Sequence, residues 1–309
     1  MTVIGGVPAA GTAGTIGTTG ARPSGPSAAL LADLAVRALG QEARLSPKPG
    51  LADRRGPGAH DDMDLPLLLA SARALRPTFR SVAEVAERTA LGIERREELG
   101  RLGRAGEAAM LRITGGVNTH RGALWALGLL VATVAGAADA REAAGHAARL
   151  AALPDRHFPA GAPSHGELAR RRYGVRGARG EAEAAFPHVV KVALPRLRRA
   201  RAAGLAEEVA RLDALLEVMS LLDDTCVLHR GGPEGLRVVR SGAERVLAEG
   251  GAGTARGHAA LVELDERCAA RRLSPGGSAD LLAAALFLDM VPWPERGART
   301  ERRVPTCKR

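Results

Sequence analysis

The chain contains few aromatic residues and few lysines. Aromatic residues make up 2% of its 309 residues, too few for the row of rings on which single-stranded nucleic acid stacks. Lysine occurs only at Lys48, Lys191 and Lys308, so arginine supplies nearly all of the basic charge. The net charge of +10 favours anionic partners. Because the basic residues are scattered rather than arranged in a stripe, we expect no nucleic acid among these partners.

Several familiar cysteine, metal and nucleotide motifs are also missing. The three cysteines, Cys226, Cys268 and Cys307, are odd in number and include no CxxC pair, which argues against a disulfide scaffold or a zinc knuckle and predicts a reducing, cytoplasmic location. No HExxH, GxSxG or GxGxxG motif is present, and no lysine follows a glycine. The sequence therefore excludes a zinc hydrolase, a serine nucleophile elbow and a Walker A loop.

Composition along the chain predicts one large domain between two tails. Residues 1–27 are mostly Gly, Ala, Thr, Ser and Pro without a charged start, which predicts a disordered tail rather than a signal peptide. Residues 295–309 are expected to form a basic C-terminal tail. The longest uncharged run beyond the first tail, residues 122–138, is interrupted by glycines and is shorter than the roughly 20 apolar residues of a membrane span. We expect a buried core helix there and no membrane insertion.

Residues 28–294 show helical periodicity almost throughout and hardly any alternating β pattern. Ser27 is expected to cap the first helix. This pattern predicts an all-α catalytic domain whose motif loops lie at the ends of its helices. The expected helices cover residues 28–42, 65–75, 81–91, 104–111, 122–138, 202–222, 241–249, 255–268 and 279–289.

The segment from Ser46 to Asp64, SPKPGLADRRGPGAHDDMD, carries cations and carboxylates around two Pro-Gly breaks. Asp61, Asp62 and Asp64 could direct several oxygens at one Mg²⁺, while Lys48 suits a phosphate. A metal-bound nucleoside polyphosphate is therefore a natural ligand. A charged, solvated loop is the alternative.

Two glycine-rich stretches are expected to precede helices. They contain Thr114, Gly115 and Gly116 in one case, and Ser274, Gly276 and Gly277 in the other. Free backbone N–H groups at a helix start bind phosphate well. Ser278 also fits an ordinary helix cap, so capping remains the alternative.

A third motif spaces Gly174, Gly177 and Gly180 three residues apart, with Arg176 and Arg179 between them. Glycines let the backbone approach an anion closely, and one guanidinium group can bind two phosphate oxygens at once. We interpret the motif as a triphosphate clamp. An RNA-contacting loop and a solvated turn remain open.

Asp223 and Asp224 follow the apolar pattern of residues 202–222. At the C-terminal end of a helix two carboxylates would oppose the helix dipole, so a divalent cation is expected to compensate them. An ion pair with His229 or Arg230 is the alternative.

In this order, the motifs PKPGL…GAHDDMD, TGGVNTHRG, RGARGEA and SPGGSADLLA resemble those of the triphosphoribosyl-dephospho-CoA synthase family, over about residues 30–288. The resemblance implies a transferase that makes 2′-(5-triphosphoribosyl)-3′-dephospho-CoA and adenine from ATP and 3′-dephospho-CoA. The product would be the precursor of the prosthetic group of malonate decarboxylase or citrate lyase.

Displacement at an anomeric carbon needs carboxylates and a base, and the resemblance implies these roles for residues in the motifs. Those expected to bind a metal or stabilise charge are Asp61, Asp62, Asp64, Asp223 and Asp224, with Glu107 and Glu181 as candidate bases. Those expected to bind substrate are Lys48, His60, Thr114, Gly115, Gly116, Asn118, His120, Arg176, Arg179, Arg230, Ser274, Gly276 and Gly277. The alternatives are a metal-dependent hydrolase of ADP-ribosyl groups or nucleosides, and a nucleic-acid-binding protein.

Overall fold

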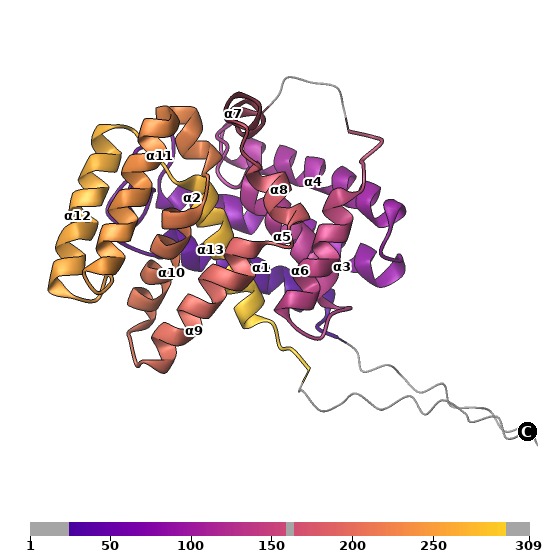
Figure 1. The fold of residues 1–309 in the computed structure, drawn as a ribbon. Coiled ribbons are helices and arrows are strands. Elements are labelled where there is room, and N and C mark those ends of the chain that lie inside the picture. Colours follow the sequence, from indigo (N-terminus) through magenta and orange to yellow (C-terminus); the bar gives the residue numbers. More distant parts are fainter. Residues whose placement is uncertain (1–24, 159–163, 295–309) are drawn as a thin grey trace, which may run out of the picture.

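A computed structural model describes residues 25–158 and 164–294 as an assembly of helices (Figure 1). The chain order is α1 (Ala28–Arg44), α2 (Leu65–Ala74), α3 (Arg76–Arg88), α4 (Ile93–Ile113), α5 (Arg121–Val134), α6 (Ala140–Ala152), α7 (His165–Tyr173), α8 (Gly177–Glu183), the π-helix η1 (His188–Ala193), α9 (Leu194–Ala202), α10 (Glu207–Leu221), α11 (Thr225–Ala248), α12 (Ala255–Ala270) and α13 (Gly276–Met290). Over the described ranges there is no strand, and the one β-bridge joins Asp53 to Gly56. The all-α prediction is confirmed.

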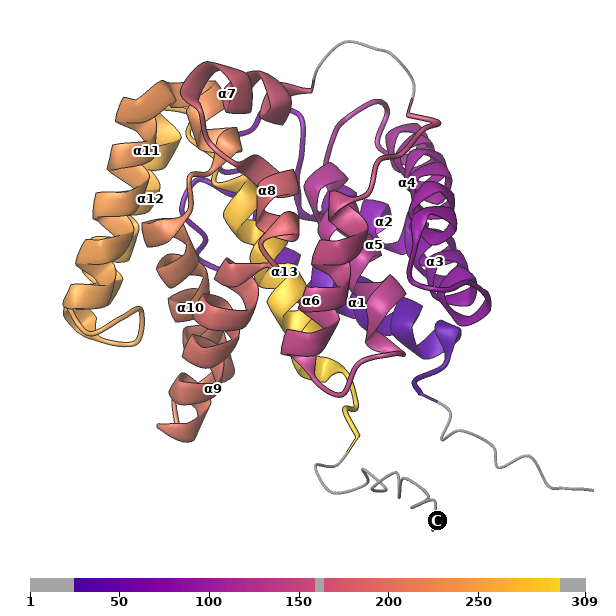
Figure 2. The same ribbon diagram turned by 45° about the vertical axis from the view of Figure 1, so that its right-hand side comes forward.

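Helix α13 forms the centre of the molecule (Figure 2). Its residues from Ser278 to Leu288 are apolar on nearly all sides and almost all buried, as expected for a helix enclosed by others. It packs against α1, α5, α10 and η1. Within the described residues, the last helix therefore joins the first helix to the middle of the sequence.

The remaining helices pack on either side of this centre. Helices α10, α11 and α12 pack consecutively on one side, whereas α3 and α4 pack together on the other (Figures 1 and 2), and α2 packs against α1 and α4. Helices α7 and α8 lie between the two groups, where α7 contacts α11, and α8 contacts α5 and α6. In the described part of the chain no helix has both the length and the apolar character needed to cross a membrane.

Several predicted helices are confirmed nearly to the residue. Helix α1 begins at Ala28, and Ser27 Oγ accepts a hydrogen bond from the Leu30 amide at 3.2 Å. Of the uncharged run of residues 122–138, residues 122–134 lie in the buried helix α5, and the run continues four residues beyond its end. The predicted tails, residues 1–24 and 295–309, lie outside the described residues.

Three expectations about helices were wrong. Residues 202–222 are not one helix, because the chain turns between α9 and α10 and Gly204 has φ +76°. The arginine motif forms the short helices α7 and α8 rather than a loop throughout. Residues 225–231 of the expected loop are helical, and α11 consists of two helical stretches that meet at a kink at Gly232, whose φ/ψ pair is not helical and which precedes Pro233.

Candidate active site

The first motif segment is held against α12 and the loop that precedes α13. The Gly50 amide donates a hydrogen bond to Asp265 Oδ1 at 2.9 Å, and Arg55 bridges Asp53 and Asp265 at 2.8 and 2.7 Å. Gly50 has φ +67°, and a Cβ added there would overlap the Leu273 carbonyl oxygen. The segment therefore requires glycine at position 50, and these contacts fix its shape.

This shape brings together His60, Arg230 and Ser274, three predicted substrate-binding residues from distant segments. His60 Nδ1 lies 3.1 Å from an Arg230 guanidinium nitrogen, and His60 Nε2 lies 2.7 Å from Ser274 Oγ. Arginine can only donate, so Nδ1 is the acceptor and Nε2 carries the hydrogen. Burial and the Arg230 charge lower the pKa of His60, against the effect of Asp62. The neutral ring therefore links two motifs.

The five carboxylates predicted to bind metal have separate environments. Asp61 pairs with Arg272, Asp64 Oδ1 caps α2 at the Leu67 amide (2.9 Å), and Asp223 pairs with Arg240 at 3.0 Å. Asp62 is exposed and lies 3.6 Å from His60 Nδ1. Within residues 25–158 and 164–294, no three His, Cys, Asp or Glu side chains gather closely enough to hold a metal ion. These carboxylates therefore do not form one cluster, and metal binding by them stays a prediction.

Asp224 is buried and joins two helix starts. Its Oδ1 accepts the Cys226 amide at 2.9 Å, while Oδ2 accepts the Ser278 amide at 2.8 Å and Ser278 Oγ at 3.0 Å. The prediction that Asp224 opposes a helix dipole was wrong, because α10 ends at Leu221 and Asp224 is the N-cap of α11. A negative charge is favourable there. The Gly277 amide also points at Asp224, at 3.4 Å, so this helix start already has an anion.

The Thr114 motif ends α4 rather than beginning a helix. Gly115 and Gly116 have positive φ, and the Gly116 amide bonds the Leu111 carbonyl at 2.7 Å, as at many helix C-termini. Thr114 Oγ1 is buried and donates to backbone carbonyls. Asn118 Oδ1 accepts the Arg121 amide at the start of α5. The expected phosphate cradle is therefore a turn between two helices, which leaves the Asn118 side chain exposed.

Lys48 and His120 lie in the interior, contrary to the expectation that both meet substrate directly. Lys48 is 1% exposed, and its Nζ lies 2.6 Å from Oε1 of the equally buried Glu42. His120 Nδ1 lies 2.9 Å from Ser71 Oγ, while its Nε2 is buried without a hydrogen-bond partner among the described residues. Burial and the Lys48 charge lower the pKa of His120 to about 4, so this imidazole is neutral at physiological pH.

The two candidate bases already have partners. Glu107 pairs with Arg121, and the buried Glu181 accepts both the His188 amide (2.9 Å) and His188 Nδ1 (2.8 Å). Glu181 therefore ties α8 to η1. Its enclosed position makes a direct encounter with a substrate hydroxyl difficult.

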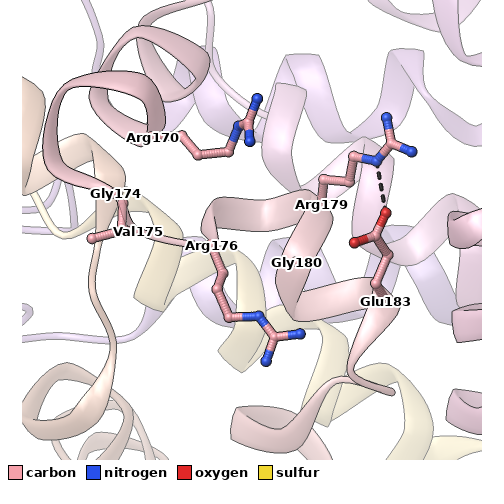
Figure 3. Close-up of a pocket in the computed structure, with 7 residues that line it drawn as sticks. All are labelled: Arg170, Gly174, Val175, Arg176, Arg179, Gly180 and Glu183. Atoms are coloured by element: carbon pink, nitrogen blue, oxygen red, sulfur yellow. Dashed lines mark hydrogen bonds and ion pairs between the residues drawn. The ribbon is translucent and has the colours of Figure 1, made fainter.

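The arginine motif lines a cavity of about 460 Å³ (Figure 3). Arg170 at the end of α7, Arg176 before α8 and Arg179 on α8 are all exposed. Arg179 is paired with Glu183 at 2.8 Å, whereas Arg176 has no ion-pair partner within the described ranges. Gly174 and Gly177 have φ of +68° and +62°, and a Cβ on Gly177 would lie 3.5 Å from Thr225. The motif thus adjoins the start of α11, next to Asp224.

Sequence reasoning missed Glu42 and Asp280, which complete this region. Asp280 accepts the Ala123 amide at the start of α5. Burial and the nearby charges of Glu42 and Asp224 raise its pKa well above the usual value. Asp280 belongs to the SPGGSADLLA motif. Its position directly before the apolar residues Leu281 and Leu282 could have identified it as a site residue from the sequence. Glu42 had none, because its partner Lys48 is recognisable only in the fold.

Comparisons with known proteins show to which family the chain belongs. The CitG family model, described as ATP:dephospho-CoA triphosphoribosyl transferase, matches residues 28–298. A protein of Azotobacter vinelandii named "probable 2-(5''-triphosphoribosyl)-3'-dephosphocoenzyme-A synthase" is 58% identical over 265 residues, covering 84% of this chain and 90% of the relative. Proteins with the same name from Pseudomonas aeruginosa PAO1 and Pseudomonas putida are each 57% identical, covering 85% and 84% of this chain and 90% and 93% of their own lengths.

No solved structure matches the chain significantly. The family model nevertheless spans all the described helices from α1 to α13, and so includes every motif contact described above. The chain therefore belongs to the CitG family of ATP:dephospho-CoA triphosphoribosyl transferases.

Proposed function

We propose that this triphosphoribosyl transferase moves the 5-triphosphoribosyl group of ATP to the 2′-hydroxyl of 3′-dephospho-CoA and releases adenine. The observation that carries the proposal is the meeting of the starts of α5, α11 and α13 at Asp224 and Asp280, with Gly177 of the arginine motif next to Thr225 at the start of α11. Carboxyl groups assist the breaking of a glycosidic bond, either as an acid or by stabilising charge. The arginines suit a triphosphate that stays intact.

The proposed roles follow from which side chains remain available. Arg170 and Arg176 are exposed and line the cavity, so they bind the triphosphate, with Arg179 sharing its charge with Glu183. His60, Arg230 and Ser274 form one polar cluster that can orient a ribose or a phosphate. Asp224 does not contact substrate directly, because its oxygens are taken by two helix starts.

We further propose that Mg²⁺ accompanies ATP. In proteins Mg²⁺ keeps several waters and needs only one or two carboxylates besides the substrate phosphates. The adjacent Asp61 and Asp62 are exposed and can supply them. Bound there, the ion would neutralise triphosphate charge. Asp64 and Asp224 have no place in this proposal, since each caps a helix start, and Asp223 pairs with Arg240 next to the buried Asp224. At Asp61 the ion would displace Arg272 from an exposed carboxylate.

The proposed reaction is tested by following adenine release from ATP with and without 3′-dephospho-CoA. We expect release only when both substrates and Mg²⁺ or Mn²⁺ are present, and no turnover in excess chelator. Equal release without 3′-dephospho-CoA would indicate the hydrolase instead, with water as acceptor. Full turnover in chelator would remove the metal from the proposal but not the transfer.

We propose that the product supplies the prosthetic group of malonate decarboxylase or citrate lyase, the two destinations that the motif resemblance implies. Loading each apo acyl carrier protein with the purified product, in the presence of its own transferase, would identify the destination. Failure with both carrier proteins would contradict the proposal.

The arginine clamp makes a specific prediction about ATP affinity. Replacing Arg176 with alanine should weaken ATP binding by about 1–3 kcal/mol, the value of a hydrogen bond to a charged group. Dephospho-CoA binding should change less. Arg171→Ala is the matched control, because Arg171 lies on α7, pairs with Glu167 and does not line the cavity. Unchanged ATP affinity in Arg176→Ala and in Arg179→Ala would contradict the clamp.

A further inference from the structure

Asp280 lies unusually close to the start of α5. A Cβ added at Gly122 would overlap Asp280 Oδ2, and the Ala123 amide donates to the same carboxyl group. Glycine at position 122 is therefore required by this approach. Asp280 keeps partial exposure as a residue although its carboxyl group has dense surroundings, whereas Glu42 and Asp224 are buried. Of the three, Asp280 is therefore the one that a bound molecule can reach.

The three carboxylates of this region are compensated to different degrees. Glu42 has the ammonium group of Lys48 at 2.6 Å. Asp224 accepts three close hydrogen bonds, between 2.8 and 3.0 Å, at two helix starts. Asp280 accepts one backbone amide and has no cationic partner among the described residues. When carboxylates crowd together, the least compensated one keeps its proton. In this group that one is Asp280.

We propose that Asp280 is the general acid of the transfer, donating its proton to N7 of the leaving adenine. The inference rests on the proposed function. As the 2′-hydroxyl oxygen of 3′-dephospho-CoA bonds to C1′, the C1′–N9 bond breaks and its electron pair moves into the adenine ring. N7 still has a free lone pair while N9 is bonded to the ribose, so it can take the proton. The hydroxyl proton passes to solvent, from which the Asp280 carboxylate is protonated again, and no net proton is consumed.

Among the charged and titratable groups around it, Asp280 is the acid whose titration should control kcat. The facing charges are Glu42 and Lys48 from the end of α1 and its following loop, Asp224 before α11, and the thiol of Cys226 on α11. Desolvation and the carboxylates Asp224 and Asp280 raise the pKa of that thiol well above 9, so it stays protonated. His120, before α5, has a pKa of about 4 and stays neutral. The protonated form of Asp280 is active, so kcat should fall as pH rises through its pKa.

The decisive experiment compares ATP with 8-azaadenosine triphosphate, whose electron-poor base leaves more easily without a proton. Asp280→Asn should lower kcat with ATP by roughly 10²- to 10⁴-fold, the usual range for a lost acid, and should abolish the fall of kcat at high pH. With the 8-aza substrate, the factor by which Asp280→Asn lowers kcat should be at least about tenfold smaller, because less proton transfer is needed. An equal deficit with both substrates would overturn the proposal, because a structural role or a general base would produce it.

Two controls keep the outcome interpretable. Asp289→Asn alters a carboxylate at the other end of α13, where Asp289 pairs with Arg198 and Arg201. This variant should leave the ratio of the kcat values for ATP and the 8-aza substrate unchanged. Should Asp280→Asn not fold, the wild-type protein still serves the test, because its high-pH fall should weaken with the 8-aza substrate and an identical fall would contradict the proposal. A wild-type protein that releases no adenine would instead contradict the proposed function.

Discussion

Replacing Asp224 with asparagine is expected to lower the free energy of unfolding by about 3 kcal/mol, since each buried donor left without its acceptor costs about 1–3 kcal/mol. The amide group of asparagine would face the Ser278 amide and hydroxyl, two donors that Oδ2 now accepts at 2.8 and 3.0 Å. Two helix starts would also lose a compensating negative charge. Activity should fall by roughly 10²-fold or more, as when an electrostatic group is lost, because the start of α13 also carries Asp280.

Urea denaturation of the variant measures this loss, and Asp223→Asn is its control. Asp223 is the neighbouring carboxylate, is half exposed and pairs with Arg240 on the surface, so its removal should cost no more than about 1 kcal/mol. If Asp224→Asn lost activity at unchanged stability, Asp224 would have a direct chemical role instead of the connecting role described above.

Replacing Lys48 with methionine should destabilise the protein by about 3–5 kcal/mol, the cost of leaving one member of a buried ion pair without its partner. Glu42 is 6% exposed, and its carboxylate would keep its charge without the ammonium group now 2.6 Å away. The double variant Glu42→Gln with Lys48→Met should regain much of the loss. The free energy of unfolding from urea titration provides the measurement.

The exposed pair Arg80–Glu84 on α3 is the matched comparison for Lys48. Its members lie 2.8 Å apart in an i, i+4 arrangement at the surface, and Arg80→Ala should change stability by about 0.5 kcal/mol or less. A Lys48→Met loss as small as this would show that water reaches Glu42 and compensates its charge.

The helices that the sequence predicted well have an apolar stripe of their own. Helices α1 and α12 repeat apolar residues at helical spacing and begin at the cap residues Ser27 and Thr254, so local pattern and fold agree. Helix α7 lacks such a stripe, and among residues 166–173 only Ala169 is buried. Its cap bond at Ser164 and its packing on α11 stabilise it instead, and packing between distant segments is not visible in local periodicity.

Residue types in the motifs predicted the polar character of the site better than the role of each residue. His60 and Ser274 are 214 positions apart, yet their side chains are in hydrogen-bond contact. Grouping these residues by motif predicted contacts of this kind between distant segments. The sequence could not show which carboxylate would be neutralised, because Asp61 pairs with an arginine 211 positions away and Lys48 with a glutamate inside α1. Asp224 was assigned to the wrong helix because the apolar pattern does not mark where α10 ends.

The central place of α13 has a consequence for synthesis on the ribosome. Until residues 276–290 have left the exit tunnel, the faces of α1 and α5 that pack on this helix lack their partner. Contacts between the first and last helices close a long loop and form late in folding. These apolar faces of the nascent chain therefore stay without their partner through most of translation, when exposed apolar surface favours aggregation. Catalytic competence would begin only after the last helix has docked.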